Sequence, residues 1–227
     1  MCGRYLQTAD ARTLAARFGL AKLGVELSAR YNIAPGQAAP VVLLEGGRRL
    51  GLQRWGLVPA WAKDARVGLK LINARAETAA EKPAFRGVFQ RRRCLVPADG
   101  FYEWRRAGKA KVPVRFTRSD GALFAFAGLW DEWSSAEGGT LRTFTILTTE
   151  ANTLVAPVHD RMPVILPEAA EGLWLDSSAK PHELQELLKP FDAAGMRAAD
   201  ASTRVNSGRE DHPGLLVPDE PLQPELL

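Results

Sequence analysis

The sequence predicts an α+β fold dominated by antiparallel β-strands that form a barrel-like core, with short helices around it. Three observations predict this class. Short apolar and β-branched segments fill the middle of the chain, and turns rich in Gly, Asp and Ser separate them. Helical patterns are few and short. The chain contains no internal repeat, and its length of 227 residues favours a single domain over residues 1–227, with two small domains as the alternative.

Helices are predicted at four places. Residues 8–19 can form one, because Thr8 or Asp10 can cap its start, Leu14 and Phe18 share a face, and Gly19 can end it. The other three segments are 82–92, which places two phenylalanines four positions apart, and two surface helices at 167–175 and 180–188.

Strands are predicted through the rest of the body. A hairpin is expected from residues 41–45 and 49–55, which Gly46 and Gly47 join. Loops are expected at 30–37, around a Pro-Gly turn, and at 55–66, which is rich in aromatic residues. The further expected strands are 94–98, 100–106, 111–118, 122–133, 141–149 and 161–167.

Charge is distributed unevenly along the chain. The net charge is +4, but residues 208–227 hold five acidic side chains and one basic one, which leaves +8 on the first 207 residues. A basic body suits a polyanionic partner, and it equally suits an ordinary solvated surface. The Pro-rich, acidic segment from about residue 208 is expected to form an extended tail. The run Arg91-Arg92-Arg93 is expected to lie on the surface.

Several classes of protein are not expected. No apolar run approaches the roughly 20 residues of a membrane helix, and the N-terminus lacks the apolar stretch of a signal peptide. We therefore expect a cytoplasmic protein that is mature from close to residue 1. The chain has no Gly-rich phosphate loop and no metal-binding Cys or His spacing, so neither a metal, a nucleotide nor another cofactor is expected.

The two cysteines differ in context. Cys94 precedes Leu95 and Val96, which indicates a buried, inert thiol. Cys2 follows the initiator Met1, and a small residue at this position permits removal of the methionine. Removal would give Cys2 a free α-amine beside its thiol, whereas retention of Met1 would block that amine.

A terminal 1,2-aminothiol has a specific chemistry with aldehydes. An α-amine has a pKa of about 7.7–8.0 and a lysine about 10.4, so roughly a tenth of the α-amine is neutral at pH 7. The neutral amine can form an imine with an aldehyde, and the adjacent thiol can close on the imine carbon to give a five-membered thiazolidine. Ring closure is intramolecular, which favours it strongly.

Cys2 belongs to the first of six motifs that follow one another in order along the chain. MCGRY, RYNIAPGQ, WGLVPAWAKD, INARAET, ADGFYEW and HDRMPVIL run in order from Met1 to about Leu166, with a weaker echo in STRVNSG at 202–208. Together they resemble the SOS-response-associated peptidase (SRAP) family of abasic-site processing proteins. The resemblance implies an SRAP-like fold in which the N-terminal cysteine crosslinks to the ring-opened aldehyde of an abasic site in single-stranded DNA. It also implies that the chain removes its own Met1.

The resemblance places the other catalytic residues on Asn73, Glu103 and His159. Glu103 lies among aromatic residues, so desolvation should raise its pKa and fit it to move protons; a salt bridge with Arg105 is the alternative. His159 lies on a turn and can donate a proton to the sugar ring oxygen. Asn73 can orient the amine or the sugar, although Asn is also common in turns.

DNA contacts are expected along the same motifs. Asn73, Arg75 and Glu77 would share one face of a strand, with Arg75 on a phosphate and Glu77 holding it. Arg4 and Arg161 are expected to pair with phosphates beside Cys2 and His159. Trp61 and Trp104 can stack on bases, although some members of the family have two adjacent aromatics where this chain has Trp61 alone. The remaining expected contacts are Asn32, Pro35 and Ser207.

Three alternatives remain open from the residues. An N-terminal-nucleophile amidohydrolase also uses a terminal cysteine, but the Asn-Gly pair that usually builds its oxyanion hole is absent from this sequence. A cysteine peptidase would combine Cys2 with His159 and either Asn73 or Glu103. A noncovalent single-strand binding module would show no preference for abasic sites. The expected protein is a monomer that associates with the nucleoid when it binds DNA.

Overall fold

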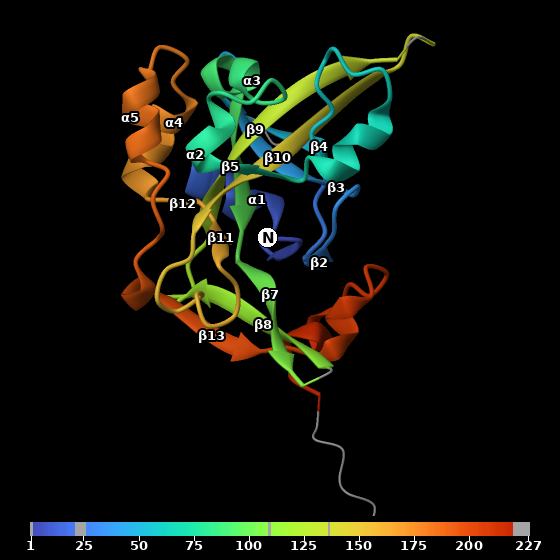
Figure 1. Ribbon diagram of the computed structural model, residues 1–227, viewed down its shortest axis with the longest axis vertical. Coiled ribbons are helices and arrows are strands. Elements are labelled where there is room, and N and C mark those ends of the chain that lie inside the picture. Colours follow the sequence, from blue (N-terminus) through green and yellow to red (C-terminus); the bar gives the residue numbers. More distant parts are fainter. Residues whose placement is uncertain (1, 21–25, 109, 136, 220–227) are drawn as a thin grey trace, which may run out of the picture.

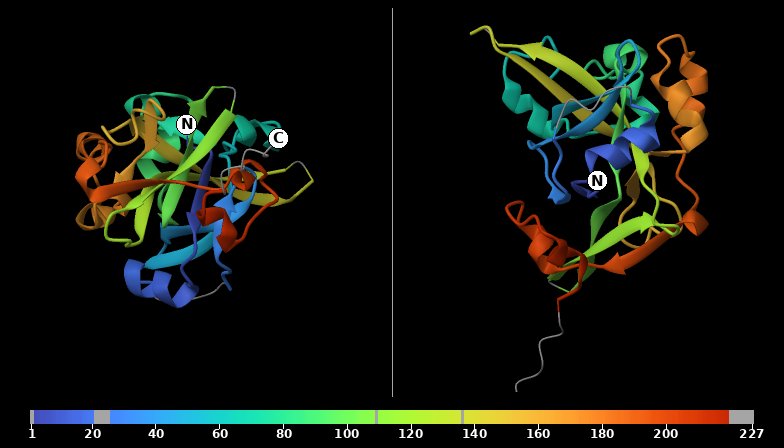
Figure 2. Two further views of the ribbon diagram at one scale, coloured as in Figure 1. Left: turned by 90° about the horizontal axis from the view of Figure 1, so that it is seen from below. Right: turned by 180° about the vertical axis from the view of Figure 1, so that it is seen from behind.

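The computed structural model describes residues 2–20, 26–108, 110–135 and 137–219 (Figure 1). Within them, one antiparallel sheet has the order β13-β8-β7-β1-β2. Its strands are β1 (Arg4–Gln7), β2 (Arg30–Ile33), β7 (Gly100–Ala107), β8 (Ala110–Arg118) and β13 (Met196–Asp200). Strand β1 therefore lies inside this sheet, between β2 and β7, and the first described residues lie in the middle of the molecule (Figure 2).

The second sheet closes on itself. Its strands β10, β4, β3, β6 and β9 pair in that order, and an antiparallel pairing of β10 with β9 completes the ring. The strands of this sheet are β3 (Ala38–Leu44), β4 (Arg48–Trp55), β5 (Asn73–Arg75), β6 (Arg93–Ala98), β9 (Phe124–Ser134), β10 (Thr140–Glu150), β11 (Arg161–Pro163) and β12 (Ile165–Leu166). The β-rich, barrel-like α+β fold expected from the sequence is confirmed, but β10 pairs in parallel with both β4 and β5.

Short helices surround the sheets, as expected. Asp10 caps α1, since its carboxylate accepts a 2.7 Å hydrogen bond from the Thr13 N–H, and Gly19 ends it with φ 62°. The α-helices are α1 (Ala11–Phe18), α2 (Ala76–Ala79), α3 (Arg86–Arg91), α4 (Glu171–Leu175) and α5 (Pro181–Glu186). The 3-10 helices are η1 (Ala65–Lys70), η2 (Glu168–Ala170), η3 (Ala193–Gly195), η4 (Thr203–Asn206) and η5 (Pro213–Leu216).

Two apolar layers hold these elements together. One cluster lies between the barrel and the five-stranded sheet and includes Tyr5, Trp55, Phe101 and Phe126. Tyr5 meets Trp55 and Phe126 edge to face at centroid distances of 5.2 and 5.8 Å. A second cluster lies beneath α1, α3, α4 and α5. The aromatic packing fixes β1 against the barrel, and with it the position of the first residues.

Three local expectations differ from the structure. Residues 30–33 form β2 because they pair with β1, so the loop begins only after Ile33. The segment 161–167 is split into β11 and β12, which pair with different partners. Residues 208–219 do not extend away from the body: Asp211 accepts hydrogen bonds from the Tyr31 and Asn32 amides, and Leu215 is fully buried. The rest of the expected tail, residues 220–227, lies outside the described residues.

The run Arg91-Arg92-Arg93 was also expected on the surface, and this is wrong for Arg93. Arg93 is 4% exposed, and its guanidinium donates to the backbone carbonyls of Phe89, Gln90, Trp174 and Asp176. These carbonyls lie at the C-terminal ends of α3 and α4, where helices leave acceptors without intrahelical donors. Arg93 therefore joins two helices.

Candidate functional site

Cys2 lies two residues before the start of β1 and is fully buried. Its backbone carbonyl accepts a 2.8 Å hydrogen bond from Nδ2 of Asn73, which stands at the start of β5. Its thiol lies 3.9 Å from the carbonyl oxygen of Arg4, at the limit of a weak sulfur hydrogen bond. Backbone and side chain of Cys2 are thus both held inside the fold, beside the strand that carries Asn73.

The environment of Cys2 keeps its sulfur protonated. Burial raises the pKa of the thiol far above its ordinary range, and the negative charge of Glu103 raises it further. A thiolate is the nucleophilic form of cysteine, so a reaction at Sγ requires a base close by. Cys94 is buried as well, and burial alone raises the pKa of its thiol.

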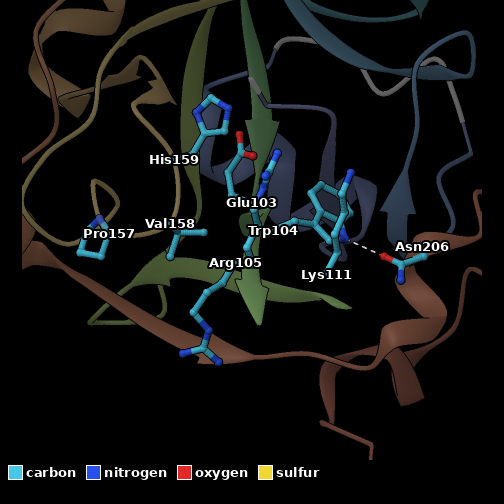
Figure 3. A pocket seen from close by; sticks show the side chains of 9 residues that line it. Glu103, Trp104, Arg105, Lys111, Pro157, Val158, His159 and Asn206 are labelled. Carbon is cyan, nitrogen blue, oxygen red and sulfur yellow. Dashed lines mark hydrogen bonds between the residues drawn. The ribbon is translucent and has the colours of Figure 1, made fainter. Parts of the chain in front are cut away.

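Glu103 is the carboxyl group beside Cys2. It lies on β7, is 3% exposed, and burial raises its pKa, while the charge of His159 acts in the opposite direction. The expected rise in pKa is confirmed. The alternative salt bridge with Arg105 is wrong, because Arg105 pairs with Asp200 at 3.0 Å. Glu103 and Arg105 alternate with Trp104 along the strand, and Figure 3 shows Glu103 directed toward His159 and Arg105 directed away from it.

His159 stands on the loop between β10 and β11. Its Nδ1 accepts a 2.9 Å hydrogen bond from the Arg161 N–H. In the neutral ring this places the proton on Nε2, so Nδ1 has none to give to the Asp160 carboxylate 3.0 Å away. Glu103 and His159 line one cavity of about 790 Å³. The carboxyl group of Glu103 and the imidazole of His159 therefore lie at the same cavity, beside the site that holds Cys2.

The segment 73–79 does not form one long strand. It pairs with β10 only over Asn73–Arg75 and then turns into α2, so Glu77 lies on the helix and does not share the strand face of Asn73 and Arg75. The Glu77 carboxylate accepts from Arg161 through both oxygens, at 2.6 and 2.9 Å. The expected Glu77–Arg75 pair is therefore wrong in this structure.

The Arg161 guanidinium forms its contacts within the protein. Besides Glu77, it donates a 2.5 Å hydrogen bond to the Thr148 carbonyl, and its side chain is 16% exposed. This differs from the open phosphate ligand that we expected at position 161. Arg161 instead ties β11 and β10 to α2, and through its backbone amide it orients His159.

Arg75 and Trp61 line a second cavity, of about 500 Å³, together with Asn73. Arg75 is exposed, and the Trp61 side chain is 67% exposed. The loop that carries Trp61 is nevertheless held on both sides: the Ala60 N–H donates to Asp131 at 2.8 Å, and the Trp133 indole N–H donates to the Ala62 carbonyl at 2.6 Å. Trp61 is thus an exposed indole on a fixed loop, available for stacking.

Arg4 and Asn32 belong to a buried junction. Asn32 accepts a 2.9 Å hydrogen bond from Arg4 and donates to the carbonyls of Val205, Ser207 and Glu210. Arg4 also donates to Val205 at 2.6 Å, and burial lowers its pKa. Asn32 is fully buried, so the expected direct DNA contact is wrong for its side chain.

The other two residues expected beside this junction lie nearer the surface. Pro35 is half-buried in the turn after β2, and Ser207 is exposed. The Ser207 carbonyl accepts from Asn32, as described, so the backbone of residue 207 is fixed while its side chain faces outward.

Comparison with known proteins agrees with this arrangement. The family model for SOS response associated peptidase (SRAP) matches residues 1–208. The chain belongs to the SRAP family. It is 44% identical over 221 residues to abasic site processing protein YoqW of Bacillus subtilis, covering 95% of this chain and 99% of that protein. It is 35% identical to abasic site processing protein HMCES of Gallus gallus, covering 84% of this chain and 66% of that protein.

Solved structures share the same SRAP fold. A protein from Bacteroides thetaiotaomicron superimposes with a TM-score of 0.87 at 30% identity, over 96% of this chain and all of that one. A protein from Bordetella bronchiseptica gives a TM-score of 0.77 at 29% identity, over 88% of this chain and all of that one. Among the described residues of this SRAP chain, no helix is long and apolar enough to cross a membrane.

The SRAP site contains residues that sequence reasoning missed. Asn206 accepts a 2.6 Å hydrogen bond from the Trp104 indole and lines the cavity of Glu103 and His159 (Figure 3). Its only signal was the weak motif STRVNSG. Asp131 and Trp133 on β9 hold the Trp61 loop from about 70 positions away in sequence. No local sequence pattern predicts these contacts, because they depend on how β9 packs beside that loop.

Proposed function

We propose that this SRAP protein senses abasic sites in single-stranded DNA and captures them covalently through Cys2, after Met1 has been removed. The observation that carries the proposal is the placement of Cys2: a second residue that is buried, anchored through its carbonyl by Asn73, and influenced by the charge of Glu103. The relatives named as abasic site processing proteins support the choice of substrate.

Removal of Met1 is the first step. Water cleaves the Met1–Cys2 peptide bond, releasing methionine and leaving a free α-amine on Cys2. We propose that the chain performs this hydrolysis itself, with Cys2, Glu103 and His159 as the reactive groups. Autoproteolysis would account for the word peptidase in the family description.

Capture then proceeds through the aldehyde. His159 donates a proton from Nε2 to the ring oxygen of the abasic sugar, and the bond between that oxygen and C1 breaks. The C1 hydroxyl gives its proton to the Glu103 carboxylate, which returns a proton to His159, and the sugar is now the open aldehyde. The Cys2 amine attacks the aldehyde carbon, and one water leaves as the imine forms. The Cys2 sulfur adds to the imine carbon while its proton passes to the Glu103 carboxylate and on to the ring nitrogen. The product is a thiazolidine, and the net change is the loss of one water.

The shifted pKa values fit this sequence. The Cys2 thiol stays protonated in its buried site, so the sulfur becomes nucleophilic only as a base accepts its proton. Burial raises the pKa of Glu103, which makes this carboxyl group a better proton acceptor and fits it to pass a proton from the sulfur to the ring nitrogen. The imine also gives the protein a lyase-like character, since imine formation at an abasic site activates the strand for elimination.

Binding of the strand completes the proposal. Trp61 and Trp104 stack on bases beside the lesion, and Arg75 contacts a phosphate, a combination that tolerates any sequence. We expect a monomer that acts in the cytoplasm and joins the nucleoid when bound to DNA, without cofactor or metal.

Intact mass measured before and after incubation with an abasic single-stranded oligonucleotide tests the proposal. We expect the purified protein to lack Met1 and to gain the mass of the oligonucleotide less one water, on Cys2. Processed protein that forms no adduct would overturn the capture mechanism. Protein that retains Met1 is first freed of it with an aminopeptidase, and the absence of an adduct then counts equally against the mechanism.

A further inference from the structure

The cavity of Glu103 and His159 extends beyond these two residues along β7. Its far end is lined by Trp104 and Arg106 on β7 and by Lys111 on β8. Figure 3 shows Lys111 beside the Trp104 ring, which its indole hydrogen bond to Asn206 fixes in place. Neither Arg106 nor Lys111 has a part in the capture chemistry described above.

Arg106 and Lys111 form an unusual pair. They stand directly opposite each other in the antiparallel register of β7 and β8. Like charges at directly opposed positions destabilise a strand pair. Across the described ranges of the chain, neither cation forms an ion pair with a carboxylate, whereas the adjacent Arg105 is paired with Asp200. An anion between the two side chains would offset their repulsion.

The edge of β7 leaves room for a ligand at this point. Strand β1 pairs with β7 only through Gly100, Phe101 and Tyr102, while β7 continues to Ala107. Beyond Tyr102, the described residues of β1 do not cover this edge. The exposed side chains of Arg106 and Lys111 lie on the part of the hairpin that continues past the pairing with β1.

The position of this cavity relative to Cys2 indicates which anion binds between Arg106 and Lys111. Asn73 and Glu103 both act on Cys2, yet they line different cavities: Asn73 shares one with Trp61 and Arg75, and Glu103 shares the other with Trp104, Arg106 and Lys111. A DNA strand whose reacting sugar reaches Cys2 can therefore contact both cavities. Each cavity offers an indole for a base and a cation for a phosphate.

We infer that Trp104, Arg106 and Lys111, here called the hairpin subsite, bind the nucleotides that flank the abasic site on one side. The ligand is the phosphodiester backbone of single-stranded DNA, with one base against Trp104. The inference rests on the proposed function and deepens it, because it assigns one flank of the strand to β7 and β8 and the other to Trp61 and Arg75.

The test measures noncovalent binding, so that it does not depend on capture. The probe is a thymidine oligonucleotide with a central tetrahydrofuran abasic analogue, which has no aldehyde. The double variant Arg106→Ala/Lys111→Ala is compared with the wild type over a range of salt concentrations. Loss of two phosphate contacts should reduce the slope of log K against log salt by about 1.4. The control Arg12→Ala/Arg49→Ala removes the same charge from exposed positions outside both cavities and should leave the slope unchanged.

Shortened probes test the assignment to one flank. Removal of the nucleotides on one side of the analogue should abolish the difference between the wild type and the double variant, and removal on the other side should preserve it. A slope equal to that of the wild type would overturn the hairpin subsite. So would a loss that is independent of which flank is removed, or an equal loss in the control.

Lys111→Glu separates binding from folding. It turns the like-charge pair into an opposite-charge pair, so it should raise the melting temperature slightly while it weakens binding of the probe. Tighter or unchanged binding would contradict the inference. An aldehyde-bearing strand run in parallel distinguishes the two proposals: absence of an adduct with the expected slopes would refute capture alone, and an adduct with unchanged slopes would refute the hairpin subsite alone.

Discussion

The side-chain amide of Asn73 donates a 2.8 Å hydrogen bond to the backbone carbonyl of Cys2. This contact joins the first residues of the chain to β5, which is itself fixed by its parallel pairing with β10. The Asn73 Oδ1 is buried and accepts no hydrogen bond from the described residues, so it is available to the amine or to the sugar. Asn73 thus holds Cys2 through one atom of its amide and leaves the other for the reaction.

Asn73→Ala should slow capture of an abasic strand by about a hundredfold, because a displacement of roughly 1 Å in a reacting group costs that much in rate. Binding of the tetrahydrofuran probe should change little. Single-turnover adduct formation on a denaturing gel measures the first quantity, and fluorescence anisotropy measures the second. Capture at the wild-type rate would show that the hydrogen bond to Cys2 does not position it.

Cys2→Ala should abolish the stable adduct and leave most of the DNA binding intact. Because the variant lacks the sulfur proposed for self-cleavage, its Met1 is first removed with an aminopeptidase. The processed variant has a terminal amine, so it should still form an imine that only borohydride reduction makes permanent. Gels run with and without borohydride distinguish the two products. A stable adduct of normal yield without reduction would remove the Cys2 sulfur from the mechanism.

Glu103→Gln should lower the capture rate by about 10²–10⁴-fold, the usual contribution of general acid–base catalysis. It should also change how stability depends on pH. Burial raises the pKa of Glu103 above the usual glutamate value of about 4.3, so the folded state binds the proton more tightly than the unfolded chain does. The wild type therefore loses stability as the pH rises through the raised pKa, and the variant does not.

Chemical denaturation from pH 4 upward measures this difference. The variant should gain stability relative to the wild type as the pH rises. Glu150→Gln removes the same charge from an exposed strand end and serves as the control. Parallel stability curves for wild type and Glu103→Gln would contradict the effect of burial on this carboxyl.

Trp133→Phe should weaken binding of single strands although Trp133 itself does not stack on them. The substitution removes the indole N–H that holds the Ala62 carbonyl and so frees the loop of Trp61, at a cost of about 1 kcal/mol in stability. In a Trp61→Ala background the same substitution should have no further effect on binding. Trp130→Phe, on the same strand, is the matched control. Additive losses in the double variant would mean that Trp133 acts independently of Trp61.

Arg75→Ala should weaken binding of intact and abasic strands alike and reduce the salt slope by about 0.7, the value for one phosphate contact with a single strand. Arg75 is exposed in the cavity of Trp61, and Glu77 does not hold it. Arg49→Ala provides an exposed control on β4. An unchanged slope would mean that Arg75 contacts no phosphate.

The linear sequence was sufficient for the fold class, the capped helix that Gly19 ends and the Gly46-Gly47 hairpin. It also supplied the residues proposed for catalysis, which are Cys2, Asn73, Glu103 and His159. Each of these depends on local pattern, on the reactivity of one residue type, or on motifs that resemble a known family. The rise in the pKa of Glu103 was also predictable, because its aromatic neighbours in the chain indicate a buried position, and burial is the cause of the rise.

The partners of the arginines were decided by the tertiary structure alone. Arg161 pairs with Glu77 across 84 positions, Arg4 joins Asn32 and residues 205–206, and Arg93 donates to carbonyls of two helices. An arginine next to a motif has the same local pattern whether it faces DNA or a carboxylate. Its long side chain donates to the acceptors that the packing of distant strands brings within reach. No periodicity in the sequence predicts which acceptors these are.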